Sequence, residues 1–360
     1  MNDKTIRLED VAKLAGVSVG SASRVLNHAP NVTQEVREKV ERAMRALRYQ
    51  PSHAARSLRS RSTKTIGCMF SDVTNPLYAR AFRALEESFR SDGYMLLLAH
   101  GLNDEQRELE SLRTFQERGM DGVICAPGHE RSPEIAAVLN AMSMPVLLYD
   151  REIPGSRADA VLFDHVEGMK QACGRLFELG HTRIALALWN AGSRPVRKRI
   201  EGYRAAYRAA NLECPDLILR QPTPTSSVYD ELLSMLEGPH PPTALIAQGT
   251  HILVSALSAV AHTGRKVPSD FSVVSIGDSD FVQTHDPAIS ALRTDVATVA
   301  AHAKALLLSR LGKDAEDNAA PRRVLVPYAL FERDSCAPAP QTAVPETRMR
   351  RASSPKQHSQ

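Results

Sequence analysis

The segment from Leu8 to Asn27 restricts the fold of this chain more than any other part of the sequence. Its first eight residues place apolar side chains on one side of a short helix. Gly16 then permits a tight turn, because glycine adopts backbone angles that other residues avoid. Ser18 is placed to cap a second helix over residues 19–26 by accepting a hydrogen bond from a free backbone N–H. The segment therefore predicts a helix-turn-helix.

A third helix and a basic connector follow this segment. Thr33 can cap a helix whose apolar residues recur at helical spacing, namely Val36, Val40, Ala43 and Leu47. We expect the three helices to form a small head over residues 1–50. Residues 51–63 begin with proline and contain three arginines, so they predict a connector with a helix of barely two turns. Such a helix is marginal in water without tertiary support.

Charge is divided unevenly along the chain. Residues 1–62 contain 12 Lys and Arg against 6 Asp and Glu, and residues 337–360 contain 4 against 1. The residues between them contain 29 against 34. A basic head on an acidic body is expected when only the head meets a polyanion. Charge alone fits a solvated surface equally well, so it indicates only that DNA binding should be considered.

The remaining sequence alternates between strand and helix patterns. Short apolar runs such as Ile66–Phe70 and Gly122–Ala126 are separated by helical patterns, and Gly93 and Gly119 stand where helices should end. This alternation predicts an α/β fold with doubly wound parallel sheets that carry helices on both faces. The stretch is too long for one sheet, so we expect two lobes. Residues 337–360 contain no Leu, Ile or Phe and are expected to be disordered.

Several classes of protein are disfavoured by what the sequence lacks. No apolar run approaches the roughly 20 residues that cross a membrane, and the first residues do not resemble a signal peptide, so a cytoplasmic protein is expected. The cysteines are scattered without a CxxC pair, which argues against a disulfide framework or a zinc site. No spacing typical of a catalytic triad, a zinc protease, a phosphate loop or a dinucleotide site is present. We therefore expect no enzyme, no catalytic residue, no cofactor and no metal.

The head resembles the helix-turn-helix of the lactose-repressor (LacI/GalR) family, whose pattern is D-V-A-x-x-A-G-V-S-x-x-T-V-S-R-V-L-N. The resemblance covers nearly the whole chain. Tyr49–Arg59 is similar to the family's hinge, Asp72–Tyr78 to its D-x-x-N-P-F-F segment, Leu179–Ile184 to L-G-H-x-R-I, and Val267–Val274 to V-P-x-D-x-S-V-V. It implies a core like that of periplasmic binding proteins over residues 64–336. Lobe 1 is expected at about 64–163 plus 292–323, and lobe 2 at about 164–291 plus 324–336.

The resemblance assigns the DNA contacts to the head. Val19, Gly20 and Arg24 would face base edges, where Arg24 can contact guanine through two hydrogen bonds and Val19 can pack on a thymine methyl. Family members usually carry a side chain at the position of Gly20, so one base contact is expected to be missing. Four further positions match residues that contact phosphate, which fix register rather than sequence: Ser18, Ser21, Asn27 and Thr33. The alternative is that these four only cap helices or are solvated.

In the hinge, Leu58 matches the family's leucine wedge, which enters the centre of the operator from the minor groove. Arg59, Ala54 and Ala55 lie on the same side. A wedge costs base stacking but bends the DNA towards more protein contacts. The alternative for Leu58 is packing within the linker. One head reads only half of a palindromic operator, so the resemblance also implies a homodimer. A tetramer is not expected, because tetrameric family members use a leucine-rich C-terminal helix and residues 337–360 contain no leucine.

The resemblance places a small-molecule effector between the lobes, near the carboxyl ends of the strands. Six residues match positions that face this cleft: Leu77, Tyr78, Asp150, Arg199, Thr250 and Asp278. Arg199 would hold hydroxyl or carboxylate oxygens with its rigid fork. Asp150 would accept from sugar hydroxyls. Tyr78 would stack on a ring, unless it is an ordinary core residue.

Two departures from the family pattern bear on the effector. Gln248–Thr250 replaces A-N-D, and Gly277 replaces the first aspartate of G-F-D-D, so groups that commonly hold neutral sugars are lost. With Arg199 retained, and Arg194, Arg197 and Lys198 nearby, a sugar acid is favoured over a neutral sugar, as in gluconate-type members. The expected function is that of an operator-binding regulator, in the first place a repressor, under control of a sugar or sugar acid. A transport binding protein, an enzyme and a ligand-free DNA-bending protein are the alternatives, and whether the effector releases DNA or favours binding is open.

Overall fold

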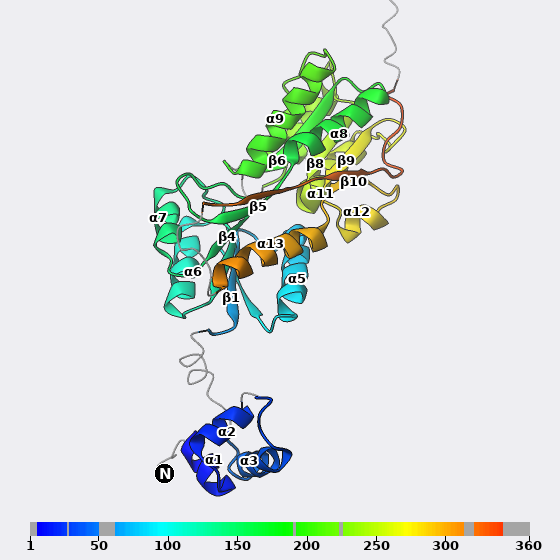
Figure 1. Ribbon diagram of the computed structural model, residues 1–360. Coiled ribbons are helices and arrows are strands. Elements are labelled where there is room, and N and C mark those ends of the chain that lie inside the picture. The colour runs from blue at the N-terminus through cyan, green and yellow to red at the C-terminus, as the bar shows by residue number, and fades with distance from the viewer. Residues whose placement is uncertain are drawn as a thin grey trace, which may run out of the picture.

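The structure, a computed structural model, describes residues 6–26, 29–49, 62–189, 192–222, 226–312 and 320–340. A helical head is followed by a core of two α/β lobes (Figure 1). No helix in these ranges is long and apolar enough to cross a membrane. The same ranges contain no group of three or more His, Cys, Asp or Glu side chains that could hold a metal ion.

The head consists of α1 (Leu8–Ala15), α2 (Val19–Leu26) and α3 (Gln34–Ala46), which confirms the predicted positions of the helices. Gly16 follows α1 with φ 65°, the left-handed conformation that a tight turn requires. Thr33 stands at the predicted N-cap of α3, but its side chain makes no capping hydrogen bond. The three helices bury one small core, formed by Val11, Ala12, Ala22, Val25, Val40 and Ala43.

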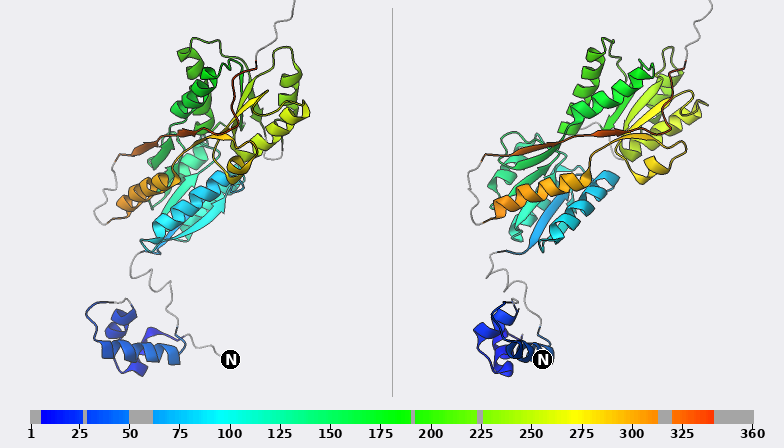
Figure 2. Two further views of the ribbon diagram at one scale, coloured as in Figure 1. Left: turned by 90° about the vertical axis from the view of Figure 1, so that its right-hand side faces the viewer. Right: turned by 45° about the vertical axis from the view of Figure 1, so that its right-hand side comes forward.

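The first lobe is built on a parallel sheet with the strand order β11-β5-β4-β3-β1-β2. Its strands are β1 (Thr65–Phe70), β2 (Met95–His100), β3 (Gly122–Ala126), β4 (Val146–Tyr149), β5 (Asp159–Phe163) and β11 (Arg323–Val326). One face of the sheet is covered by α5 (Pro76–Arg90) and α13 (Val296–Leu311), and the other by α6 (Glu105–Glu117) and α7 (Pro133–Ala141) (Figure 2). Gly93 and Gly119 end the preceding helical segments with positive φ, as predicted.

The second lobe is built on a sheet with the order β12-β10-β9-β8-β6-β7. Its strands are β6 (Ile184–Trp189), β7 (Ile218–Gln221), β8 (Ala244–Gln248), β9 (Ser272–Ile276), β10 (Ser290–Arg293) and β12 (Ala329–Phe331). Only β12 is antiparallel to its neighbour, so the predicted parallel sheet is confirmed up to this edge strand. Helices α8 (His165–Glu178) and α9 (Arg194–Ala209) cover one face, α10 (Tyr229–Glu237) and α11 (Gly249–His262) cover the other, and the short α12 (Asp280–Thr284) follows β9.

The chain crosses between the lobes after β5, after β10 and after β11. The last crossing corrects the expected boundary near residue 323. Leu325 and Val326 still pair with Leu162 and Phe163 of β5, so the first lobe extends to the end of β11. The alternating pattern could not show this, because β11 is only four residues long and its register is set by a strand more than 150 positions earlier.

The expectation of disorder from residue 337 onward is wrong for the first residues of that segment. The amide of Ala337 donates to Ser272 Oγ at 3.1 Å, and its carbonyl accepts from His181 Nε2 at 2.9 Å. The amide of Ala339 donates to the Leu179 carbonyl at 2.7 Å. Backbone hydrogen bonds, which composition does not report, therefore fix residues 337–339 to the second lobe. Residues 341–360 lie outside the described ranges.

Candidate functional site

A cleft lies between the two lobes, where the carboxyl ends of parallel strands from both sheets meet. Its central cavity has a volume of about 310 Å³. The cavity is lined by Ser71, Asp72, Asn75, Tyr78, Asn103, Gly128, His129 and Arg151 from the first lobe, and by Trp189, Gly192, Ser193, Val196, Pro222 and Gln248 from the second. These residues lie at or after the carboxyl ends of seven different strands. The cleft is thus the kind of site that α/β sheets offer to small molecules.

Two further cavities lie between the lobes, one beside the central cavity and one beyond it. A small cavity of about 40 Å³ shares Asn75 and Gln248 with it and contains four of the predicted residues: Leu77, Arg199, Thr250 and Asp278. A third cavity of about 450 Å³ lies beside the crossing segments and is lined by Leu77, Arg80, Asp278, Val296 and Tyr328, among others. The structure therefore brings five of the six predicted effector residues to the cavities between the lobes, with Asp150 as the exception.

Arg199 lies on α9 and is 4% exposed. Burial raises the pKa of the nearby Tyr328 hydroxyl to about 12, and the charge of Arg199 partly opposes this rise. The Nε and Nη1 atoms of Arg199 have no hydrogen-bond partner in the described part of the chain. Buried donors in native proteins are almost always satisfied, and leaving a charged one unpaired is costly. Two donors of a buried cation are thus available at the wall of the small cavity.

Tyr78 stands at the start of α5 and faces the central cavity. Its ring stacks on Phe70 with centroids 4.8 Å apart, and its hydroxyl accepts a hydrogen bond from Arg151 Nη2 at 2.7 Å. Core packing and exposure to the cleft are therefore combined in one side chain. Arg151 itself is buried and also donates from Nε to the Pro127 carbonyl at 2.6 Å.

Thr250 and Asp278 lie on the second-lobe side of the small cavity. The Thr250 hydroxyl is 2.8 Å from the Ser279 hydroxyl. The Asp278 carboxylate is 2.8 Å from Arg333 and 3.5 Å from Arg293, so its charge is balanced within its own lobe. The Asp278 carbonyl accepts a hydrogen bond from Arg80 of the first lobe. This end of the cleft thus contains more arginine side chains than carboxylates.

Asp150 is buried with φ 52° and does not line any of the three cavities. Its carboxylate accepts from the Phe163 amide at 3.1 Å, from His165 Nε2 at 2.8 Å and from Arg194 Nη1 at 3.0 Å. Burial tends to raise the pKa of Asp150, but His165 and the two nearby arginines hold it below its usual value. Asp150 is thus occupied by protein partners, and its expected contact with sugar hydroxyls stays a prediction.

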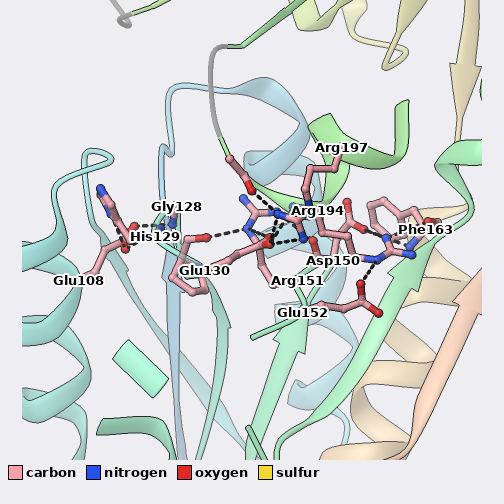
Figure 3. Close-up of polar contacts among 12 residues, drawn as sticks. Glu108, Gly128, His129, Glu130, Asp150, Arg151, Glu152, Phe163, Arg194 and Arg197 are labelled. Carbon is pink, nitrogen blue, oxygen red and sulfur yellow. Dashed lines mark hydrogen bonds and ion pairs between the residues drawn. The ribbon is translucent and has the colours of Figure 1, made fainter. Parts of the chain in front are cut away.

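Charged side chains join the two lobes beside the cavity (Figure 3). Arg194, the first residue of α9, places its guanidinium between Asp150 and Glu152 of the first lobe, and its Nε is 3.1 Å from Glu152. Its backbone amide donates to Glu130 at 2.7 Å, and Arg197 is 3.4 Å from the same carboxylate. Burial raises the pKa of Glu130 to about 7, although Arg151, Arg194 and Arg197 oppose this. The sequence had marked the basic cluster of α9, but nothing in it indicated Glu130 as its partner.

Other cleft residues were missed for a similar reason. Asn103, His129 and Trp189 come from segments that show no motif, and only the folded sheets bring them together. Arg151 could have been found, because it lies two positions after the short apolar run Val146–Tyr149, which forms β4. The His129 ring contacts the fully buried Glu108 at 3.1 Å, so this loop is fixed by a carboxylate on α6.

In the head, α2 divides into a buried side and an exposed side. Ala22 and Val25 are buried, whereas Val19, Gly20 and Arg24 are exposed. Ser18 Oγ accepts the Ser21 amide at 3.1 Å, which confirms the predicted cap. A side chain at Gly20 would meet only Ser18 Oγ, at 3.8 Å, so packing does not require glycine there. Asn27 and the predicted hinge contacts Ala54, Ala55, Leu58 and Arg59 lie outside the described residues.

Comparison with known proteins matches both parts of the chain. Residues 7–52 match the model of bacterial regulatory proteins of the lacI family, and residues 173–336 match a periplasmic binding protein-like domain. The ribose operon repressor of Escherichia coli K12 is 31% identical over 288 residues, which cover 79% of this chain and 87% of that protein. Among solved structures, a lac repressor dimer bound to operator and an anti-inducer covers 93% of this chain and 100% of its own, with a TM-score of 0.80 and 23% identity. A complex of the transcriptional regulator CelR with cellobiose has a TM-score of 0.66 and 26% identity, covering 92% of this chain and 99% of its own.

Proposed function

This chain belongs to the lacI family of bacterial regulatory proteins and is a DNA-binding transcription regulator, and from this premise we propose that it is a repressor controlled by a sugar or sugar acid bound between its lobes. Ligands that bridge two lobes change the angle between them, which supplies a way to move the DNA-binding segments. The single observation that carries the proposal is Arg199, a buried cation with two free donors in the described part of the cleft.

The exposed side of α2 is proposed to enter the major groove. Val19, Gly20 and Arg24 form this side, and Ser18 and Ser21 at its start are placed for phosphate contacts. Thr33, at the start of α3, is also proposed to contact a phosphate, because its hydroxyl makes no hydrogen bond that caps the helix. Within the described residues the Arg24 side chain makes one long hydrogen bond, 3.4 Å from its Nε to the Gly20 carbonyl, which a guanine could readily replace.

Replacing Arg24 by alanine is expected to cost about 1–3 kcal/mol of binding to the selected operator and much less on random DNA, because a bidentate contact to guanine is lost. Fluorescence anisotropy at fixed salt concentration measures both affinities. Lys39→Ala is a control in the same head, since Lys39 pairs with Glu35 on α3. Equal losses on operator and random DNA would assign Arg24 to phosphate instead.

A homodimer on a palindrome is the proposed form. The edge strand β2 and the turn after it expose four large apolar side chains: Met95 (63% exposed), Leu97 (41%), Leu98 (43%) and Leu102 (44%). An exposed apolar edge strand is an aggregation hazard unless it is covered. A second copy of the chain would cover this strand. Two copies are also needed to read a palindrome, because each head reads only one half-site.

The effector is proposed to be a sugar acid, as for gluconate-type members, with a neutral sugar as the alternative. Sugars are named for two solved relatives, one bound to cellobiose and one to ribose. In this chain the small cavity combines Arg199 and Arg80, while the Asp278 carboxylate is already balanced by Arg333. A carboxylate on the ligand would pair with the free Arg199 donors through charge-assisted hydrogen bonds, which are the stronger kind.

Ligand titration with an Arg199→Ala variant tests this function. Gluconate and ribose serve as probe ligands. Their binding is measured by the shift of the thermal midpoint and by the change in operator affinity. We expect the variant to lose about 10- to 150-fold in affinity, the loss of one hydrogen bond to a charged group at about 1.5–3 kcal/mol. Operator binding without ligand should be nearly unchanged.

The exposed Arg204 lies on the same helix, so Arg204→Ala is the matched control and should respond like the wild type. A normal ligand response of Arg199→Ala, or its complete loss of DNA binding, would show that the effector site is elsewhere. A response to ribose but not to gluconate would retain the site and reject the acidic effector.

A further inference from the structure

The carboxylate of Asp121 receives most of the hydrogen bonds that hold the last residues of the connector on the first lobe, beside one contact of 3.1 Å from the Thr63 hydroxyl to the Gly119 carbonyl. Asp121 directly precedes β3, at the end of the sheet opposite the cleft. Its Oδ1 accepts from the Thr63 amide at 2.7 Å and from the Thr63 hydroxyl at 2.9 Å. Its Oδ2 accepts from the Lys64 amide at 3.1 Å and from the Ser62 hydroxyl. One side chain thus receives four donors from three consecutive residues.

Lys64 completes this attachment. It has φ 53°, so the chain turns sharply between the connector and β1. Its Nζ lies 4.1 Å from the centre of the Tyr94 ring, and its carbonyl accepts the Met95 amide at 2.9 Å. A left-handed conformation is unfavourable for a residue with a Cβ and persists only where its surroundings hold it. The direction in which the connector leaves the lobe is therefore fixed by tertiary contacts.

We propose that Asp121 is a positioning residue that couples the first lobe to the DNA-binding head. The proposal rests on the function proposed above, because a lobe movement can control DNA only if the connector moves with the lobe. The cleft lies at the carboxyl ends of the strands and the connector at their amino ends, so the lobe must act as a rigid body between them. Asp121 makes the connection at the far end.

Loss of this carboxylate adds free residues to the tether of each head. The effective concentration of the second head at its half-site falls when a tether lengthens or loosens. Asp121→Ala should therefore weaken binding to a full palindrome by at least about tenfold, while binding to an isolated half-site is unchanged. The ratio of operator affinities without and with effector should fall towards one, while effector affinity of the DNA-free protein is unchanged.

Asp92→Ala is the matched control. Asp92 also lies at this end of the lobe, but its carboxylate pairs with Lys304 at 2.7 Å and makes no hydrogen bond to residues 62–64. Two milder variants guard against a folding defect. Asp121→Asn keeps one acceptor oxygen, and the double variant Ser62→Ala/Thr63→Val removes the hydroxyl donors but keeps both amide contacts. The affinity of both variants for the full palindrome should lie between that of the wild type and that of Asp121→Ala. Their thermal midpoints should equal that of the wild type.

The experiment combines DNA binding with hydrogen exchange on the full-length dimer. A palindrome selected from random DNA and its single half-site are titrated by anisotropy, and exchange of the Thr63 and Lys64 amides is followed without DNA. We expect both amides to be protected in the wild type and in Asp92→Ala, and exposed in Asp121→Ala. Rapid exchange in the wild type, or full palindrome affinity in a folded Asp121→Ala protein, overturns the coupling role. Equal wild-type affinity for the palindrome and the half-site overturns the proposed function, and the coupling role with it.

Discussion

Replacing Asp150 by alanine is expected to lower the free energy of unfolding by about 3–5 kcal/mol. The substitution leaves Arg194, which is 5% exposed, without its buried carboxylate and removes the acceptor of the Phe163 amide and of His165. Breaking a buried pair by removing one partner costs this much because the other charge cannot return to water. Urea unfolding followed by circular dichroism measures the change.

Glu152→Ala provides the comparison on the same arginine. The Glu152 side chain is 45% exposed, so its contact with Arg194 is largely screened and its loss should cost less than about 1 kcal/mol. The loss of unfolding free energy in Asp150→Asn should lie between those of Asp150→Ala and Glu152→Ala, since asparagine keeps an acceptor oxygen but loses the charge. If Asp150→Ala cost no more than Glu152→Ala, the buried contacts of Asp150 would contribute little and its predicted role in binding an effector would regain weight.

The wild-type protein is expected to lose up to about 3 kcal/mol of stability relative to a His165→Gln variant as the pH falls from 7 to 4. Burial lowers the pKa of His165 to about 4 from its usual 6.5, against the attraction of Asp150. In this pH interval the unfolded chain takes up a proton that the folded protein does not. Stability from the neutral histidine is therefore complete above pH 6.5 and decreases towards pH 4.

The comparison between two proteins isolates His165 from other titrating groups. Glu130, whose pKa is raised to about 7, adds stability as the pH falls, but it does so in the wild type and in the His165→Gln variant alike. Glutamine keeps an amide donor for the Asp150 carboxylate and does not titrate. Urea midpoints measured at half-unit pH intervals give the difference, and two parallel curves would show that His165 titrates as in the unfolded chain.

Several features could be predicted because they are local. The turn at Gly16 and the cap at Ser18 depend on residues within a few positions of each other, and the structure contains both. The alternation of strands and helices predicted the sheets, since each element shows its own periodicity. Gly202 follows Arg199 by three positions on α9, and a Cβ there would lie 2.6 Å from the Val166 carbonyl of α8. The sequence showed this glycine, but only the packing of α9 on α8 explains it.

The contacts that decide the site could not be predicted, because their partners are distant in sequence. Asp150 was expected to face a ligand, yet Arg194, 44 positions later, occupies its carboxylate. Asp121 shows no motif, and its role follows only from the return of the chain to residues 62–64. Periodicity and motifs report the conformation and chemistry of neighbouring residues. Which buried charge meets which partner depends on how the two lobes pack. Because desolvation is costly, that pairing, rather than residue type, determines which groups remain free to bind.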